Sequence, residues 1–168
     1  MNIKTLMTAA AVATATATSA NAQVLSWSGF FVTGPPESVG TIETTNFVDE
    51  IQFDLSVTAL GNSWGSELLI VILGGPDSVE ILASGGSTPD ADLYFNWANA
   101  PGDYLFTGSL GVALNPGTYE VLLVDTFNNP SVFPDAIYGA SSISFIPAPG
   151  TAGLVVAGGL FGMRRRRR

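Results

Sequence analysis

The chain has 168 residues, no cysteine and a formal net charge of −8 at pH 7. Its six basic residues are Lys4 and the last five residues, so residues 23–146 hold all 14 acidic residues and no Lys, Arg or His. Affinity for phosphates comes from Lys and Arg, so we expect no nucleic-acid partner for this region. Without cysteine, the chain can form neither a disulfide nor a thiolate metal site.

Residues 1–22 have the pattern of a secretory signal peptide. Lys4 supplies a positive charge, residues 6–17 form a weakly apolar stretch, and Ala20-Asn21-Ala22 is an A-x-A cleavage site. We expect the mature chain to begin at Gln23. The alternative is a disordered leader rich in Ala and Thr.

Residues 23–146 are expected to form one all-β domain, which is long enough to bury a core. Apolar and polar residues alternate over residues 51–59, which predicts a strand with one wet face. The apolar runs 68–73 and 121–124 predict central strands that are buried on both faces. Together with turn residues between them, these segments predict about eight or nine strands in an antiparallel β-sandwich, jelly-roll-like or Ig-like. Further strands are expected at 27–33, 79–83, 93–97, 104–107 and 142–146.

Part of this domain resembles bacterial pre-peptidase C-terminal domains. The resemblance rests on Asp90-Ala91-Asp92-Leu93-Tyr94 and on Leu114-Asn115-Pro116-Gly117-Thr118-Tyr119-Glu120-Val121, which together span about 30 residues. Domains of that family are secreted β-sandwiches that act as binding or secretion modules. The resemblance therefore implies a module of this kind and not a catalyst.

Catalysis is disfavoured by the side chains that the domain contains. A serine nucleophile needs a base such as His or Lys, and residues 23–146 have neither. Zinc and most transition-metal sites need His or Cys. Hydrolysis of a sugar by two carboxylates is the chemistry that remains. We expect that the protein is not an enzyme.

Two acidic loops could bind Ca²⁺, which prefers oxygen ligands. Asp90 and Asp92 lie in one loop, and Asp125 and Asp135 border a second loop that contains Asn128. The alternative is that these residues are ordinary turn caps.

Exposed tryptophans could stack on sugars, and Trp64, in the polar loop 61–65, is the one that we expect to be exposed. The alternative for each tryptophan is packing in the core or at its rim.

The last 22 residues combine a turn motif, an apolar segment and a basic cluster. Pro147-Ala148-Pro149-Gly150 comes first, residues 151–163 carry no charge, and five arginines end the chain. As a helix, the 13 apolar residues would be roughly 20 Å long, which is short for a membrane span. Arginines stay on the cytoplasmic side of a membrane, so these five predict a stop to export. They are Arg164, Arg165, Arg166, Arg167 and Arg168.

This three-part order resembles the PEP-CTERM sorting signal of Gram-negative bacteria. That signal is read by exosortase, a membrane enzyme that is taken to cleave near the proline motif. The central Glu of the usual motif is replaced here by Ala148, so the chain carries a Pro-Ala-Pro-Gly variant. The alternative is a plain C-terminal tail anchor.

These observations predict three segments: a signal peptide at 1–22, a β-sandwich at 23–146 and a sorting signal at 147–168. We expect an exported protein that passes through the inner membrane and is sorted by an exosortase-like enzyme to the cell surface or the extracellular polysaccharide matrix. Its expected role there is structural or adhesive. The alternatives are a glycan-binding module, with or without Ca²⁺, and a plain tail-anchored envelope protein.

Overall fold

The computed structural model describes residues 21–127 and 134–149. Residues 20–148 form one compact unit. Most of the expected signal peptide, Asn128, Gly150 and the arginine cluster lie outside the described residues, as does the expected C-terminal apolar helix. Within the described residues, no helix has the length and apolar character needed to cross a membrane.

The first sheet, sheet A, is built around β4 (Val48–Ala59). β8 (Gly102–Leu114) pairs with β4 along one side, and β10 (Ala136–Tyr138) and β11 (Ser141–Pro147) pair with successive parts of its other side. β1 (Gln23–Trp27) lies beside β11, and β2 (Phe30–Val32) lies beside β10. All of these pairs are antiparallel.

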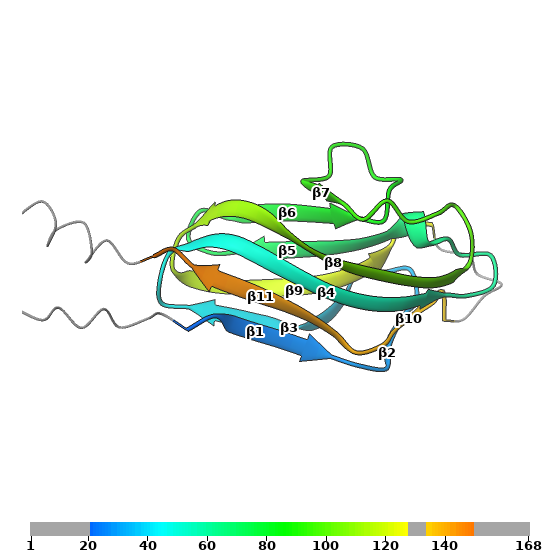
Figure 1. Ribbon diagram of the computed structural model, residues 1–168, viewed down its shortest axis with the longest axis horizontal. Coiled ribbons are helices and arrows are strands. Elements are labelled where there is room, and N and C mark those ends of the chain that lie inside the picture. The colour runs from blue at the N-terminus through cyan, green and yellow to red at the C-terminus, as the bar shows by residue number, and fades with distance from the viewer. Residues whose placement is uncertain (1–20, 128–133, 150–168) are drawn as a thin grey trace, which may run out of the picture. The chain divides into compact units, whose positions relative to one another are not determined.

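The second sheet, sheet B, has the strand order β3-β9-β5-β6-β7. β3 (Glu37–Thr44), β9 (Gly117–Asp125), β5 (Leu68–Gly74) and β6 (Val79–Ser84) pair antiparallel, and the short β7 (Leu93–Tyr94) pairs parallel with β6. A short 3-10 helix, η1 (Gly65–Glu67), leads into β5. Figure 1 shows the two sheets as separate layers.

Both sheets contribute to one apolar core. The period of two along each strand sends alternate side chains inward. On β4 these are Ile51, Phe53, Leu55 and Val57, which are at most 2% exposed. The largest fully buried side chains are aromatic, and two of them, Tyr119 of β9 and Phe145 of β11, have ring centroids 5.5 Å apart. The core therefore lies between the faces of the two sheets.

The all-β prediction is confirmed, and several strands lie where they were expected. β4, β5, β6, β9 and β11 contain the segments predicted for them. Both faces of β5 are buried, since Leu69 and Val71 on its second face are each only 8% exposed. β9 is central as predicted, but Leu122 and Val124 on its outer face are only half-buried.

Other expectations were incomplete or wrong. The strand predicted at 27–33 is divided into β1 and β2 by a turn at Gly29, which has a φ of 67° that favours glycine. The strand predicted at 93–97 has only two residues, because Asn96 has a φ of 57° and the chain turns there. β3 and β10 were not predicted, and β8 is much longer than the predicted segment 104–107.

Candidate functional site

The outer face of sheet A carries a polar trough. The side chains of β4 that alternate with its core residues point outward here, and β8 and β11 supply polar residues on either side. The register aligns these residues in two rows across the strands: Ser142, Asp54 and Thr107 form one, and Ser144, Gln52 and Ser109 form the other. Neighbouring strands lie about 4.8 Å apart, so each row spans roughly 10 Å.

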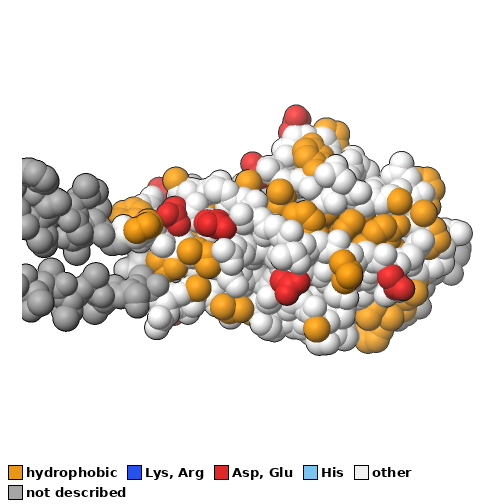
Figure 2. Space-filling model, in the orientation of Figure 1, with side chains coloured by type: hydrophobic (Ala, Val, Ile, Leu, Met, Phe, Trp, Pro, Cys, Tyr) orange, Lys and Arg blue, Asp and Glu red, His pale blue; other side chains and the backbone are white. Residues whose placement is uncertain are grey.

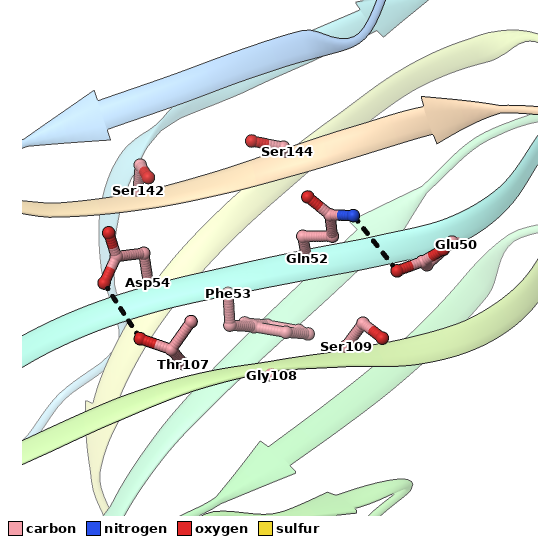
Figure 3. A pocket seen from close by; sticks show the side chains of 9 residues that line it. All are labelled: Glu50, Gln52, Phe53, Asp54, Thr107, Gly108, Ser109, Ser142 and Ser144. Atoms are coloured by element: carbon pink, nitrogen blue, oxygen red, sulfur yellow. Dashed lines mark hydrogen bonds between the residues drawn. The ribbon is translucent and has the colours of Figure 1, made fainter.

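The trough has a volume of about 510 Å³ and is lined by these two rows together with Glu50, Phe53 and Gly108. Figure 3 shows the side chains of the two rows, together with Glu50, standing on three adjacent strands. Thr107 Oγ1 donates a hydrogen bond to Asp54 Oδ1 at 3.3 Å, and Gln52 Nε2 donates to Glu50 Oε1 at 3.1 Å. The remaining hydroxyl and amide groups can donate to and accept from a ligand.

A second hollow adjoins the trough and shares Asp54 and Ser142 with it. It is also lined by Ser26, Trp27 and Ser28 of β1 and the turn after it, and by residues 140 and 141. The Trp27 ring is half-buried and lies 6.2 Å, centroid to centroid, from the ring of Tyr138. Its indole N–H has no hydrogen-bond partner within the described structure. Trp27 is opposite Ser141 in the register, one residue from the Ser26–Ser142 pair, so its ring packs against the core on the inner side of sheet A.

The trough is acidic and offers no cation. Among the described residues there is no Lys, Arg or His, and the face in Figure 2 shows separate acidic groups on a mostly uncharged surface. Such a surface can hydrogen-bond a neutral ligand that carries hydroxyl groups, but it repels anions.

A buried pair of carboxylates lies outside the trough. Asp125, the last residue of β9, is 3% exposed, and Asp135, just before β10, is 1% exposed. Asp125 Oδ1 accepts the N–H of Phe127 at 2.9 Å, and Asp135 Oδ1 accepts the hydroxyl of Ser63 at 3.2 Å. Asp125 Oδ2 has no hydrogen-bond partner within the described structure.

The pKa of Asp125 is raised to about 6, chiefly by burial and to a smaller extent by the charges of Asp135 and Glu67, against the lowering effect of the hydrogen bond from Phe127. Burial also raises the pKa of Tyr138, and the nearby charge of Asp125 adds to this effect. The Tyr138 hydroxyl is fully buried, and the described residues give it no hydrogen-bond partner. Ionisation of Asp125 within this buried group therefore destabilises the folded state.

The two loops considered for Ca²⁺ differ in their geometry. Asp125 and Asp135 come together, whereas Asp92 is engaged with β6. Its carboxylate accepts the N–H of Leu82 at 2.9 Å, and its own N–H donates to Leu82 O at 2.8 Å. Asp90 is exposed and has a φ of 62°. No group of three or more acidic or other metal-ligating side chains is assembled within residues 21–127 and 134–149. Calcium binding stays a prediction.

Trp64 is exposed, as expected, with 41% of its surface accessible. Its backbone N–H donates to Glu67 Oε2 at 3.0 Å at the start of η1. Trp64 does not line the trough, whereas Trp27 borders the adjoining hollow. Trp97 is buried among aromatic rings, with its centroid 4.7 Å from that of Phe95.

The ends of the compact unit lie close together. Gln23, where the mature chain is expected to begin, pairs with Phe145 in the register of β1 and β11. Pro147 is the last residue of β11 and pairs with Val48, and the N–H of Ala148 donates to Phe47 O at 2.8 Å. The first half of the Pro-Ala-Pro-Gly motif is therefore held against β4, and Pro149 is exposed.

The sequence revealed the wet face of β4 but not the trough. Thr107, Ser109, Ser142 and Ser144 were missed, because only the strand register brings them beside Asp54 and Gln52. The alternation of serine with apolar residues in residues 141–146 was the available signal. The chain matches no protein-family model, and it matches no curated protein.

Proposed function

We propose that this protein is exported and acts at the cell surface or in the extracellular polysaccharide matrix, with a structural or adhesive role and no enzymatic activity. An exosortase-like membrane enzyme sorts it through its C-terminal segment, with the inner membrane as a transient location. The observation that carries the proposal is the order of Pro147-Ala148-Pro149-Gly150, an uncharged segment and five arginines at the end of the sequence.

The finer architecture proposed for the domain is an antiparallel β-sandwich, jelly-roll-like or Ig-like. The shared core of sheets A and B supports this, because side chains of both sheets form one buried cluster. The domain is also acidic and without cations, which suits a soluble domain that repels nucleic acid and anionic surfaces.

Two variants test the sorting proposal. Replacing Arg164–Arg168 with serine removes the cations that oppose translocation, at roughly 2.5–3.5 kcal/mol each. The unprocessed chain should then pass into the soluble fraction outside the inner membrane. Replacing Pro147 and Pro149 with alanine keeps the arginines, so the full-length chain should accumulate in the membrane instead. Identical fractionation and mass of the two variants and the wild type would contradict the proposal.

Glycan binding in the trough is the second candidate function. It is favoured by the two rows of hydroxyl, carboxylate and amide groups on the outer face of sheet A. Sugars are bound through hydrogen bonds to their hydroxyl groups.

A glycan array, with and without Ca²⁺, tests this second candidate. Binding of a neutral glycan should be lost in Gln52→Ala and Asp54→Asn and kept in Thr41→Ala, which changes an exposed residue of the other sheet. Trp64→Ala is a second control, because Trp64 lies outside the trough. No binding to any glycan, or equal binding by all four variants, would refute this function.

A further inference from the structure

The long strand β8 forms an open edge of sheet A. Among the described residues, β8 pairs only with β4. The N–H of Gly139 donates to Ser56 O at 2.7 Å, so the backbone of Ser56 faces β10 and β11. Successive residues of a strand face opposite sides, so Phe53 and Leu55 of β4 face β8. Gly108 and Phe106 of β8 are the partners of Phe53 and Leu55, so their backbone N–H and C=O groups bond to β4. The backbone groups of the alternate residues Leu105, Thr107 and Ser109 therefore point away from β4.

A side-chain contact agrees with this assignment. The indole Nε1 of Trp97 donates to Leu105 O at 3.3 Å, which places that carbonyl on the open side of β8. Beyond it, the alternation leaves the backbone N–H and C=O groups of Thr107, Ser109 and Gly111 facing outward. These groups are a template for another strand.

From Leu105 to Gly111 the β8 edge lacks the usual protections against pairing, and the register shift in its pairing with β4 comes only after Gly111. Residues 104–114 contain no charged residue and no proline. In contrast, the edge strand β3 carries Glu37 and Glu43 and a break in register between Ser38 and Gly40. β7 has only two residues, and β1 and β2 have five and three. Charges, bulges and short length are the devices by which edge strands avoid association.

Apolar side chains beside this edge are incompletely covered. Phe106, Leu110 and Val112 pack against the core but are only half-buried. A cleft of about 330 Å³ separates this part of β8 from Val79 and Ile81 of β6. In Figure 2, hydrophobic atoms form a band over the region between β8 and β6. A strand added to β8 would cover part of this band.

We propose that β8 pairs antiparallel with β8 of a second copy of this chain, about a two-fold axis at Gly108, so that sheet A continues from one copy into the next. In this register Thr107 lies opposite Ser109 of the second copy and Phe106 lies opposite Leu110. The ladder stops before Leu105, because the Leu105 carbonyl already accepts the indole N–H of Trp97. Small or hydrogen-bonding residues thus face each other on the outer side, and apolar residues face each other on the inner side.

The uncharged strip allows a second copy to be the occupant although each domain is acidic. Each domain is strongly acidic, so two copies can approach only where their carboxylates are not opposed. The 104–114 strip is such a place, and the two-fold register puts Asp103 opposite Ala113 rather than opposite another acid. Glu80 and Asp92 line the cleft beside the strip, but the strip itself is uncharged, and its residues complement one another in the two-fold register.

Because the chain has no cysteine, single cysteines report the pairing directly. Thr107→Cys and Ser109→Cys chains are mixed under mild oxidation, with Thr41→Cys on the edge strand β3 as the control. Opposed Cα atoms lie about 5.5 Å apart, within disulfide range. The mixture should give disulfide-linked dimers in excess of either variant alone, and Thr41→Cys should give few. Cross-linking of the mixture no greater than that of Thr41→Cys would overturn the proposal.

Sedimentation of the whole chain in mild detergent provides the second test. Ser109→Pro removes an outward N–H and leaves the bonds of β8 to β4 intact, and proline is tolerated on an edge strand. The dimer of Ser109→Pro should dissociate at least about tenfold more readily than that of Ser109→Ala, which keeps the N–H. Circular dichroism shows whether Ser109→Pro is folded. If this variant is unfolded, the cross-linking of Thr107→Cys with Ser109→Cys decides whether the two copies pair. A wild-type chain that sediments as a monomer, or equal dimers of the two variants, would overturn the proposal.

Discussion

Replacing Asp125 with asparagine should stabilise the protein at pH 7. The side chain is 3% exposed, and its pKa is raised from 3.8 to about 6, chiefly by burial. A carboxyl group whose pKa is raised by folding stabilises the native state fully below its unfolded pKa, and this contribution is lost as the pH rises through the folded pKa. At pH 7 Asp125 is ionised, and its raised pKa lowers the free energy of unfolding by about 3 kcal/mol relative to an aspartate whose pKa is unshifted.

The geometry of the site indicates that asparagine can fill it. Its Oδ1 can still accept the N–H of Phe127, and its Nδ2 replaces an oxygen that has no hydrogen-bond partner within the described structure. The free energy of unfolding of Asp125→Asn should exceed that of the wild type by up to about 3 kcal/mol at pH 7. The difference should shrink as the pH falls from about 6 to about 4.

Urea denaturation at a series of pH values measures this difference. Asp90→Asn is the matched control, since Asp90 is an exposed aspartate in a loop of the same domain. The wild type also changes with pH through its other carboxylates, so only the difference between variant and wild type is informative. A difference that does not change with pH, or an Asp125→Asn protein less stable than the wild type at pH 7, would show that the buried Asp125 carboxylate does not destabilise the fold.

Three further predictions concern the same domain. Tyr138→Phe should leave stability unchanged or raise it by about 1 kcal/mol in urea denaturation, because the buried hydroxyl has no partner among the described residues; a large loss would show that the hydroxyl is bonded. Turbidity should rise as the pH falls toward about 4, since protonation removes the repulsion between acidic copies; flat solubility would contradict this. If Ca²⁺ binds at Asp125 and Asp135, millimolar Ca²⁺ should raise the Tm of the wild type but not that of Asp125→Asn, since binding adds up to about 2.7 kcal/mol to the free energy of unfolding at 100 times Kd; no shift against a chelator baseline would retire the site.

Strands with regular alternation could be predicted from the sequence, and interrupted ones could not. Ile51, Phe53, Leu55 and Val57 alternate with polar residues and identify β4 at once. β3 has one fully buried apolar residue, Ile42, and its Gly40 breaks the pattern, so the strand gave no comparable signal. Its position is determined by pairing with β9, which lies far along the chain.

Glycine explains why β8 was predicted too short. Gly108 interrupts the apolar alternation after Phe106, so the sequence suggests an end to the strand. In the structure, a Cβ atom at Gly108 would lie 2.6 Å from Cζ of Phe106. The glycine therefore makes room for the aromatic ring on the inner face, and the strand continues to Leu114.

The candidate site depended on register, which no local pattern encodes. Asp54, Thr107 and Ser142 come from three strands, and only the pairing of β4 with β8 and β11 brings them into one row. Asp125 and Asp135 could be grouped from the sequence because they border one loop. Their burial could not be predicted from the sequence, because acidic residues at loop ends are usually solvated.

The intact mass of the wild-type protein tests sorting most directly. The chain is expressed in a host that has its own sorting enzyme and is recovered from outside the inner membrane. We expect a product that begins at Gln23 and ends near Pro147–Gly150, without Arg164–Arg168. A chain found full length in the membrane, with all five arginines still attached, would contradict it and leave the plain tail anchor.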